Sequence, residues 1–285
     1  MPGVQMRPQI GIGSFAYRYA IGSSDFRPDR PMTVFGFLSE AHRLGFDGVQ
    51  LCENLAYSKL DKEQLIAVKE KAQELGLFVE VGMRDVTVEN LLRHLQIAEL
   101  LSSKFLRVVL GSVRLTPEEE PARMIKDATR NLKEVLPICR KLGLTVGIEN
   151  HFDLRTEDLI GIVEGIGDER VGMILDTTNC LGFMERPEET LQALKPYLRS
   201  IHLKDYSIRK VEAGYLISGT PLGDGWLNTA EILREAMAAN PELTIILELN
   251  VRRKEGQSVA EILRSEEQMI IRSLGYLNTV LAGIS

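Results

Sequence analysis

Leu198-Arg199-Ser200-Ile201-His202-Leu203-Lys204-Asp205 alternates apolar and polar residues, as a short buried β-strand does. Because side chains alternate between the two faces of a strand, Ile201 and Leu203 share one face. His202 and Lys204 share the other face, so this strand directs an imidazole and an amine towards one place. The question is then whether other strands deliver complementary groups to that place.

Strand-like segments recur along the chain and alternate with helical patterns. Besides 198–205, strands are predicted at 9–14, 48–52, 77–81, 105–110, 145–149, 172–176 and 243–248. Helices are predicted at 33–44, 61–75, 87–101, 117–142, 156–166, 187–194 and 258–277, the fourth of them beginning with Pro117 and the acidic run 118–120. Eight strands in this alternation predict an α/β fold, a (β/α)8 TIM barrel that forms a single domain over residues 1–285.

An open, doubly wound sheet is the alternative architecture. Gly11, Gly13 and Ala16 match the looser GxGxxA form of a dinucleotide-binding fingerprint. A helix should open directly after that motif, whereas an aromatic loop with Phe15 and Tyr17 follows here. The nucleotide-binding fold is therefore the weaker interpretation.

Composition excludes several classes of protein. The formal net charge of −6 disfavours a nucleic-acid partner, because such proteins usually carry a basic surface. No apolar run is long enough to span a bilayer, and the first residues lack the apolar core of a signal peptide, so we expect a cytoplasmic protein without a membrane partner. Cys52, Cys139 and Cys180 are widely spaced and are expected to be buried free thiols rather than zinc ligands.

Acidic residues end three of the predicted strands. Asp176 follows Glu149 by 27 positions and His202 follows Asp176 by 26, about one strand-helix unit each. Glu248 comes 46 positions after His202, and the unusually long loop predicted at 206–225 accounts for the excess. Because the carboxyl ends of barrel strands surround one mouth, these four side chains should converge there.

Three carboxylates and one imidazole form an oxygen-rich ligand set. Such a set suits Mn²⁺ first, with Mg²⁺, Co²⁺ or Zn²⁺ as alternatives. Carboxylates gathered in a mouth raise one another's pKa, and a divalent cation would relieve that repulsion. The alternative is that each acid is paired with a nearby Lys or Arg.

The same residues resemble a known family. The segments Gly147-Ile148-Glu149-Asn150-His151, Leu175-Asp176-Thr177-Thr178-Asn179, Ile201-His202-Leu203-Lys204-Asp205, Pro221-Leu222-Gly223-Asp224-Gly225 and Leu247-Glu248-Leu249 are similar to motifs of the xylose isomerase-like TIM barrels, in the sugar phosphate isomerase/epimerase group. The resemblance implies metal ligation by Glu149, Asp176, His202 and Glu248, with both glutamates also acting as acid and base. It further implies a small-molecule carbohydrate substrate and allows a homo-oligomer.

One position departs from the pattern of many epimerases in this group. They carry His three residues after the strand-six Asp, whereas this chain has Asn179, which cannot act as a titrating base. Assignment to the ketose 3-epimerases is therefore weakened. Further substrate-binding candidates at the mouth are His151, Asn179, Lys204, Arg107, Arg84, Gln50 and Asn54.

The expected chemistry starts from a hydroxyketone that chelates the metal, which acidifies the intervening C–H and stabilises an enediolate. Glu149 or Glu248 removes the proton, and its return gives an epimer or an isomer. Expulsion of a β-hydroxyl would instead make the protein a dehydratase or lyase of a keto-inositol or 3-keto glycoside. Two further alternatives are an abasic-site endonuclease, for which the four histidines are too few to form a His-rich zinc cluster, and a non-catalytic sugar-binding barrel.

Overall fold

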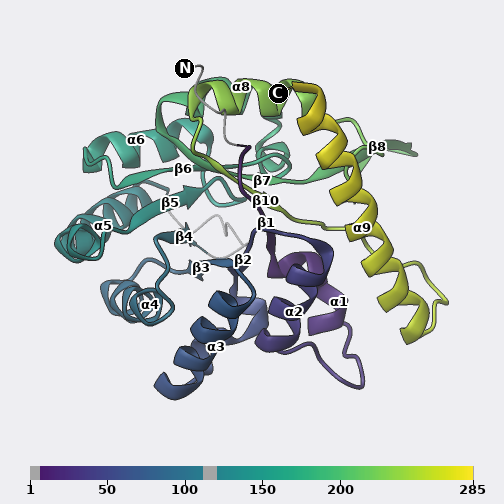
Figure 1. Ribbon diagram of the computed structural model, residues 1–285. Helices are drawn as coiled ribbons and strands as arrows, with labels where there is room; N and C mark the ends of the chain where they lie inside the picture. Colours follow the sequence, from purple (N-terminus) through teal and green to yellow (C-terminus); the bar gives the residue numbers. More distant parts are fainter. Residues whose placement is uncertain (1–6, 112–120, 285) are drawn as a thin grey trace, which may run out of the picture.

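The computed structural model describes residues 7–111 and 121–284, and it contains a closed barrel of parallel strands (Figure 1). Around the barrel the strands follow the order β1-β10-β7-β6-β5-β4-β3-β2. They are β1 (Ile10–Gly13), β2 (Gly48–Leu51), β3 (Phe78–Arg84), β4 (Phe105–Val109), β5 (Thr145–Glu149), β6 (Val171–Asp176), β7 (Leu198–Leu203) and β10 (Thr244–Leu247). The predicted α/β TIM barrel is confirmed.

Helices surround the barrel and connect its strands (Figure 1). They are α1 (Arg18–Ile21), α2 (Val34–Leu44), α3 (Lys62–Glu74), α4 (Val88–Leu100), α5 (Pro121–Leu142), α6 (Thr156–Ile166), α7 (Pro187–Leu194), α8 (Thr229–Ala239) and α9 (Val259–Ile284). Capping explains several boundaries: the side chains of Thr33, Asp61 and Thr87 accept N-terminal backbone N–H bonds, and Gly45 ends α2 with a φ of 84°. The predicted helix start at Pro117 and 118–120 lies outside the described residues.

The segment predicted as a long loop at 206–225 is mostly an antiparallel hairpin, so that expectation was wrong. Strand β8 (Asp205–Val211) pairs with β9 (Gly214–Thr220), and Figure 1 shows the hairpin extending outwards from the barrel. Gly214 has a φ of 146°, a conformation open mainly to glycine, and it permits the tight return between the strands. Most residues of the segment 206–225 therefore form a second, two-stranded sheet.

An aromatic ring packs against the starts of β1 and β2. A Cβ placed on Gly48 would lie 2.2 Å from the Phe78 ring, and one on Gly11 would lie 2.8 Å from it, so both glycines make room for this ring. No helix among the described residues has the length and apolar character needed to cross a membrane.

Candidate metal centre

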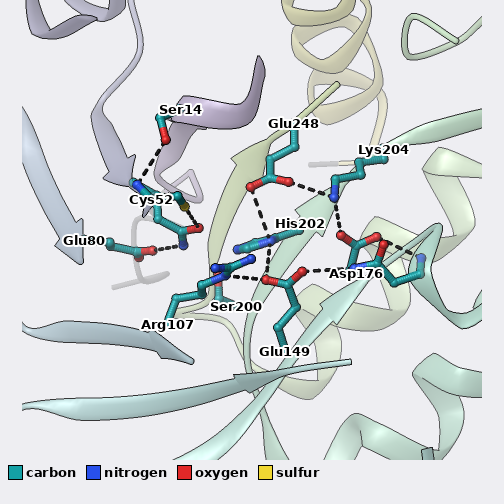
Figure 2. Close-up of polar contacts among 12 residues, drawn as sticks. Ser14, Cys52, Glu80, Arg107, Glu149, Asp176, Ser200, His202, Lys204 and Glu248 are labelled. Atoms are coloured by element: carbon teal, nitrogen blue, oxygen red, sulfur yellow. Dashed lines mark hydrogen bonds and ion pairs between the residues drawn. The ribbon is translucent and has the colours of Figure 1, made fainter. Parts of the chain in front are cut away.

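Four consecutive strands of the barrel deliver the predicted ligands to one place (Figure 2). Glu149 and Asp176 are the last residues of β5 and β6, His202 lies in β7, and Glu248 directly follows β10. Asp176 and His202 are register partners on adjacent parallel strands, which sets them side by side. All four side chains are buried, with exposed fractions of 2% or less.

The ligand atoms are close enough to share one cation. Among the described residues, Glu149, Asp176 and His202 each offer an atom within 4.8 Å of the other two. Glu248 joins them less tightly, since its Oε1 lies 3.7 Å from His202 Nδ1, while Glu149 Oε2 lies 3.2 Å from the same nitrogen. The structure therefore brings three of the predicted ligands together and places the fourth at the edge of the group.

Unpaired buried atoms test whether these residues fit a metal ion. Both ring nitrogens of His202 and the Oε1 atom of Glu248 are buried and make no hydrogen bond, although His202 Nδ1 lies within ion-pair distance of both glutamates. Buried polar atoms are nearly always hydrogen-bonded, because leaving one without a partner costs about 1–3 kcal/mol. Imidazole nitrogen and carboxylate oxygen are ligands for divalent transition metals, so a cation between the glutamates could be bound by one ring nitrogen of His202 and by Glu248 Oε1. The residues present fit a divalent metal.

The carboxylate of Asp176 can offer one oxygen only. Its Oδ1 accepts hydrogen bonds from Thr178 N at 2.9 Å, Thr178 Oγ1 at 3.1 Å and Asn179 N at 3.1 Å. The remaining atom, Oδ2, lies 2.5 Å from Lys204 Nζ, which also lies 2.8 Å from Glu248 Oε2. Lys204 thus holds two proposed ligands in place, each by one oxygen.

Arg107 and Lys204 supply part of the positive charge that the acids need. The Arg107 Nε donates to Glu149 Oε2 at 2.5 Å, and the guanidinium is only 2% exposed. Burial alone would raise the pKa of Glu149. The charges of Arg107 and His202 lower it by more than burial raises it, so the pKa lies well below its ordinary value. Burial likewise raises the pKa of Glu248, and Lys204 with His202 brings it below normal. Both glutamates are therefore carboxylates at neutral pH.

Glycines on neighbouring strands make room for these charged groups. A Cβ on Gly13 would lie 2.6 Å from Glu248 Oε1, so a larger residue at this position would displace that carboxylate. A Cβ on Gly82 would lie 3.3 Å from Arg107 Cδ. The sequence analysis noted Gly13 only as part of a weak nucleotide-binding motif, and the structure gives it this steric role instead.

Two other predicted substrate-binding residues lie next to the ligands. Asn179 donates through Nδ2 to Glu149 Oε1 at 3.0 Å and to the Asn150 carbonyl at 3.1 Å. His151 is 8% exposed, and its Nδ1 is buried without a partner. Burial lowers the pKa of His151 to about 4, so this imidazole is neutral at neutral pH.

The remaining candidates have partners outside the ligand group. Arg84 pairs with Glu53 at 3.1 Å, and Glu53 also lies 3.4 Å from Arg107 Nη1, which links Arg84 indirectly to the centre. Gln50 donates to Glu80 at 2.8 Å within the barrel. Asn54 accepts from Ser14 at 2.5 Å. Their roles in binding substrate stay predictions.

Sequence reasoning missed the residues that orient the ligands. Thr178 fixes the Asp176 carboxylate, and Asn150 exchanges two hydrogen bonds with the Asp176 backbone, at 2.6 and 3.0 Å. Both residues stood within the motifs that carried the family resemblance, but nothing in their spacing indicated these contacts. The two helical histidines bond backbone carbonyls far from the centre, His42 that of Leu75 and His94 that of Asn90.

Comparisons with known proteins agree with this architecture. The family model described as "Xylose isomerase-like TIM barrel" matches residues 38–278. A 3-oxo-isoapionate decarboxylase from Pectobacterium atrosepticum is 25% identical over 272 residues, which cover 95% of this chain and 95% of that protein.

Solved structures share the fold at lower sequence identity. A D-psicose 3-epimerase, crystallised in the presence of D-fructose, has a TM-score of 0.73 at 14% identity, covering 95% of this chain and 99% of that one. A xylose isomerase-like TIM barrel protein from Mycobacterium smegmatis, in complex with magnesium, has a TM-score of 0.66 at 17% identity, with 98% of both chains covered. With a family model that spans most of its length, the chain belongs to the xylose isomerase-like TIM barrel family.

Proposed function

We propose that the protein is a divalent-metal-dependent sugar isomerase or epimerase that acts on a keto sugar or related polyol through an enediolate, with Mn²⁺ as the preferred ion. The observation that carries the proposal is the set of buried atoms of His202 and Glu248 that make no hydrogen bond and lie beside Glu149 and Asp176. A cation bound there would act as a Lewis acid that acidifies the C–H between two substrate oxygens and stabilises the enediolate.

The two glutamates take different parts in the proton transfer. Both oxygens of Glu149 accept hydrogen bonds, from Arg107 and from Asn179, whereas Oε1 of Glu248 accepts none. Glu248 is therefore the base that removes the substrate proton, and Lys204 keeps it ionised and in position. If Glu248 returns the proton to the adjacent carbon, the product is an isomer. An epimer requires Glu149 to pass a proton taken up from water to the other face of the substrate, while Glu248 loses its proton to water.

A lyase is the second candidate, favoured by the decarboxylase relative that covers 95% of this chain. Loss of CO₂ from a 3-keto acid would leave the same type of enolate that proton removal produces, so one electrostatic environment could serve both reactions. Decarboxylation needs no base to break a C–H bond, but it does need an acid to protonate the product. Asn179 cannot fill that role, which leaves it to one of the two glutamates.

The test is a solvent-deuterium screen with keto sugars, keto-inositols, 3-keto glycosides and 3-keto acids. Each is incubated with protein and Mn²⁺ in D₂O, the metal is removed, and NMR reads the position of the label and the identity of the product. We expect metal-dependent exchange at a carbon next to a carbonyl, abolished by EDTA and by Asp176→Ala. CO₂ release without exchange of the starting compound would select the lyase. Cleavage of an abasic duplex, or the absence of any metal-dependent reaction, would contradict both readings.

A further inference from the structure

A cavity of about 230 Å³ opens beside the candidate metal centre. Lys204 forms part of its wall, and the Nζ atom of the same side chain contacts Asp176 and Glu248. The cavity therefore adjoins the centre directly. The other side chains that matter for its character are Phe152, Thr178, Leu181, Tyr206, Ile217 and Asn250.

The β8–β9 hairpin builds one wall of this cavity. Tyr206 pairs with Gly219 and Ile208 with Ile217, and directly paired residues of an antiparallel ladder lie on the same face. Residues on one face of a strand alternate, and this face supplies Tyr206, Ile217 and Gly219 to the lining of the cavity. Leu216 belongs to the opposite face.

The hairpin wall is held firmly against the barrel. A Cβ on Gly219 would lie 2.3 Å from the Asn250 carbonyl oxygen, so the β9 backbone rests directly on the segment that follows Glu248. At the base of the hairpin, the Asp205 carboxylate accepts hydrogen bonds from the backbone N–H groups of Gly223, Gly225 and Leu227, each at 3.0 Å. The cavity is thus a preformed feature of the fold.

The charges and size of the cavity define what it can hold. Its charged lining residues are Lys204 and Asp205, and both are already engaged, Lys204 by two carboxylates and Asp205 by backbone N–H groups. Among the described residues that line the cavity, no free cation remains to bind a phosphate, which proteins usually hold with Arg, Lys or free N–H groups. At about 30 Å³ for each water-sized group, the volume admits roughly seven or eight non-hydrogen atoms.

We propose that this cavity binds the non-reacting end of the substrate, and that this end is uncharged and hydroxylated, so that the substrate is a free ketose rather than a sugar phosphate. The proposal rests on the function proposed above. Carbon-bound hydrogens of the sugar would lie on the apolar side chains of Phe152 and Ile217. Asn250 and the Thr178 hydroxyl oxygen, whose hydrogen is donated to Asp176, would meet its hydroxyl groups.

Binding to single probes tests this without requiring turnover. The probes are D-fructose, D-fructose 6-phosphate and three-carbon dihydroxyacetone, and their affinities for the Mg²⁺-loaded protein are measured by ligand-observed NMR. Ile217→Trp fills the cavity. Leu216→Trp is the matched control, because Leu216 is 44% exposed against 40% for Ile217 but lies on the opposite face of the hairpin.

We expect D-fructose to bind more tightly than its 6-phosphate. The Ile217→Trp variant should weaken fructose binding by about tenfold or more, in line with the effect of blocking a pocket for a few atoms, and should leave dihydroxyacetone unaffected. The Leu216→Trp variant should bind both fructose and dihydroxyacetone as the wild type does. A preference for the phosphate, equal fructose affinity in both variants, or no binding of any probe would overturn the proposal. Binding of fructose without metal-dependent deuterium exchange would instead reject the proposed function while the pocket assignment stands.

Discussion

Replacing Arg107 by methionine should make the stability of the fold depend on bound metal. Arg107 and Glu149 are an ion pair with exposed fractions of 2% and 1%, so the substitution leaves a carboxylate buried beside one fewer cation. Breaking a buried pair by removing one partner costs about 3–5 kcal/mol. At roughly 2–4 °C per kcal/mol for a domain of this size, the melting temperature of the metal-free protein should fall on the order of 10 °C.

A divalent cation at the centre should restore most of that loss. The ion would lie against Glu149 and replace the missing positive charge, so it should bind the variant more tightly and raise its stability more than that of the wild type. The measurement is thermal and urea unfolding, followed by circular dichroism, of both proteins in EDTA and in saturating Mn²⁺.

Arg84→Met is the control for the loss of an arginine. Arg84 pairs with the partly exposed Glu53 and donates to the Gly111 carbonyl at 3.0 Å. Partly exposed ion pairs are worth about 0–1 kcal/mol, so this variant should melt close to the wild type with or without metal. If Mn²⁺ stabilised the wild type and the Arg107→Met variant by equal amounts, Glu149 would not face the ion. If the two proteins were equally stable in EDTA, Glu149 would not be a buried carboxylate.

Three further substitutions have defined outcomes. Glu248→Gln should reduce deuterium exchange by about 10²–10⁴-fold while calorimetry still detects metal binding, and unchanged exchange would remove Glu248 as the base. Gly13→Ala should displace the Glu248 carboxylate and weaken metal binding, whereas Gly161→Ala, whose added Cβ would meet nothing within 4 Å, should not; equal affinity in both would contradict the steric argument. Burial raises the pKa of Glu266 from its ordinary 4.5 to about 7, so the folded state binds a proton on this carboxyl group more tightly than the unfolded state does. The free energy of unfolding should therefore decrease as the pH rises from about 4.5 to about 7. Glu266→Gln should flatten that part of the pH profile, and an unaltered slope would contradict the assignment.

Much of the fold follows from local patterns in the sequence. The alternation within 198–205 and the recurrence of short apolar runs were sufficient for a closed parallel barrel, because each run meets the same requirement of burial on both sides. The β8–β9 hairpin was missed because its outer part is exposed on both faces, so the adjacent polar residues Arg209 and Lys210 resemble those of a loop. Exposed strands carry a weaker signal than buried ones.

The sequence predicted which residues form the candidate centre, but it did not predict the contacts between them. Spacing of one strand-helix unit indicated that Glu149, Asp176 and His202 end adjacent strands, and the closed barrel makes such ends converge. The pairing of Lys204 with Asp176 and Glu248, rather than with its neighbour Asp205, depends on distances between strands that no local pattern encodes. The space left by Gly13 depends in the same way on the neighbouring strand.

The charges assembled at the centre suit a reaction that moves negative charge onto the substrate. The carboxylates of Glu149, Asp176 and Glu248 face the cations of Arg107 and Lys204, which leaves one net negative charge when the imidazole is neutral. A divalent cation would change this to one net positive charge. In the proposed reaction the substrate proton passes to Glu248, so the total charge stays the same while negative charge moves from that carboxylate to the substrate oxygens beside the cation. Groups fixed in advance where charge develops stabilise the transition state more than the ground state, which is the condition for catalysis.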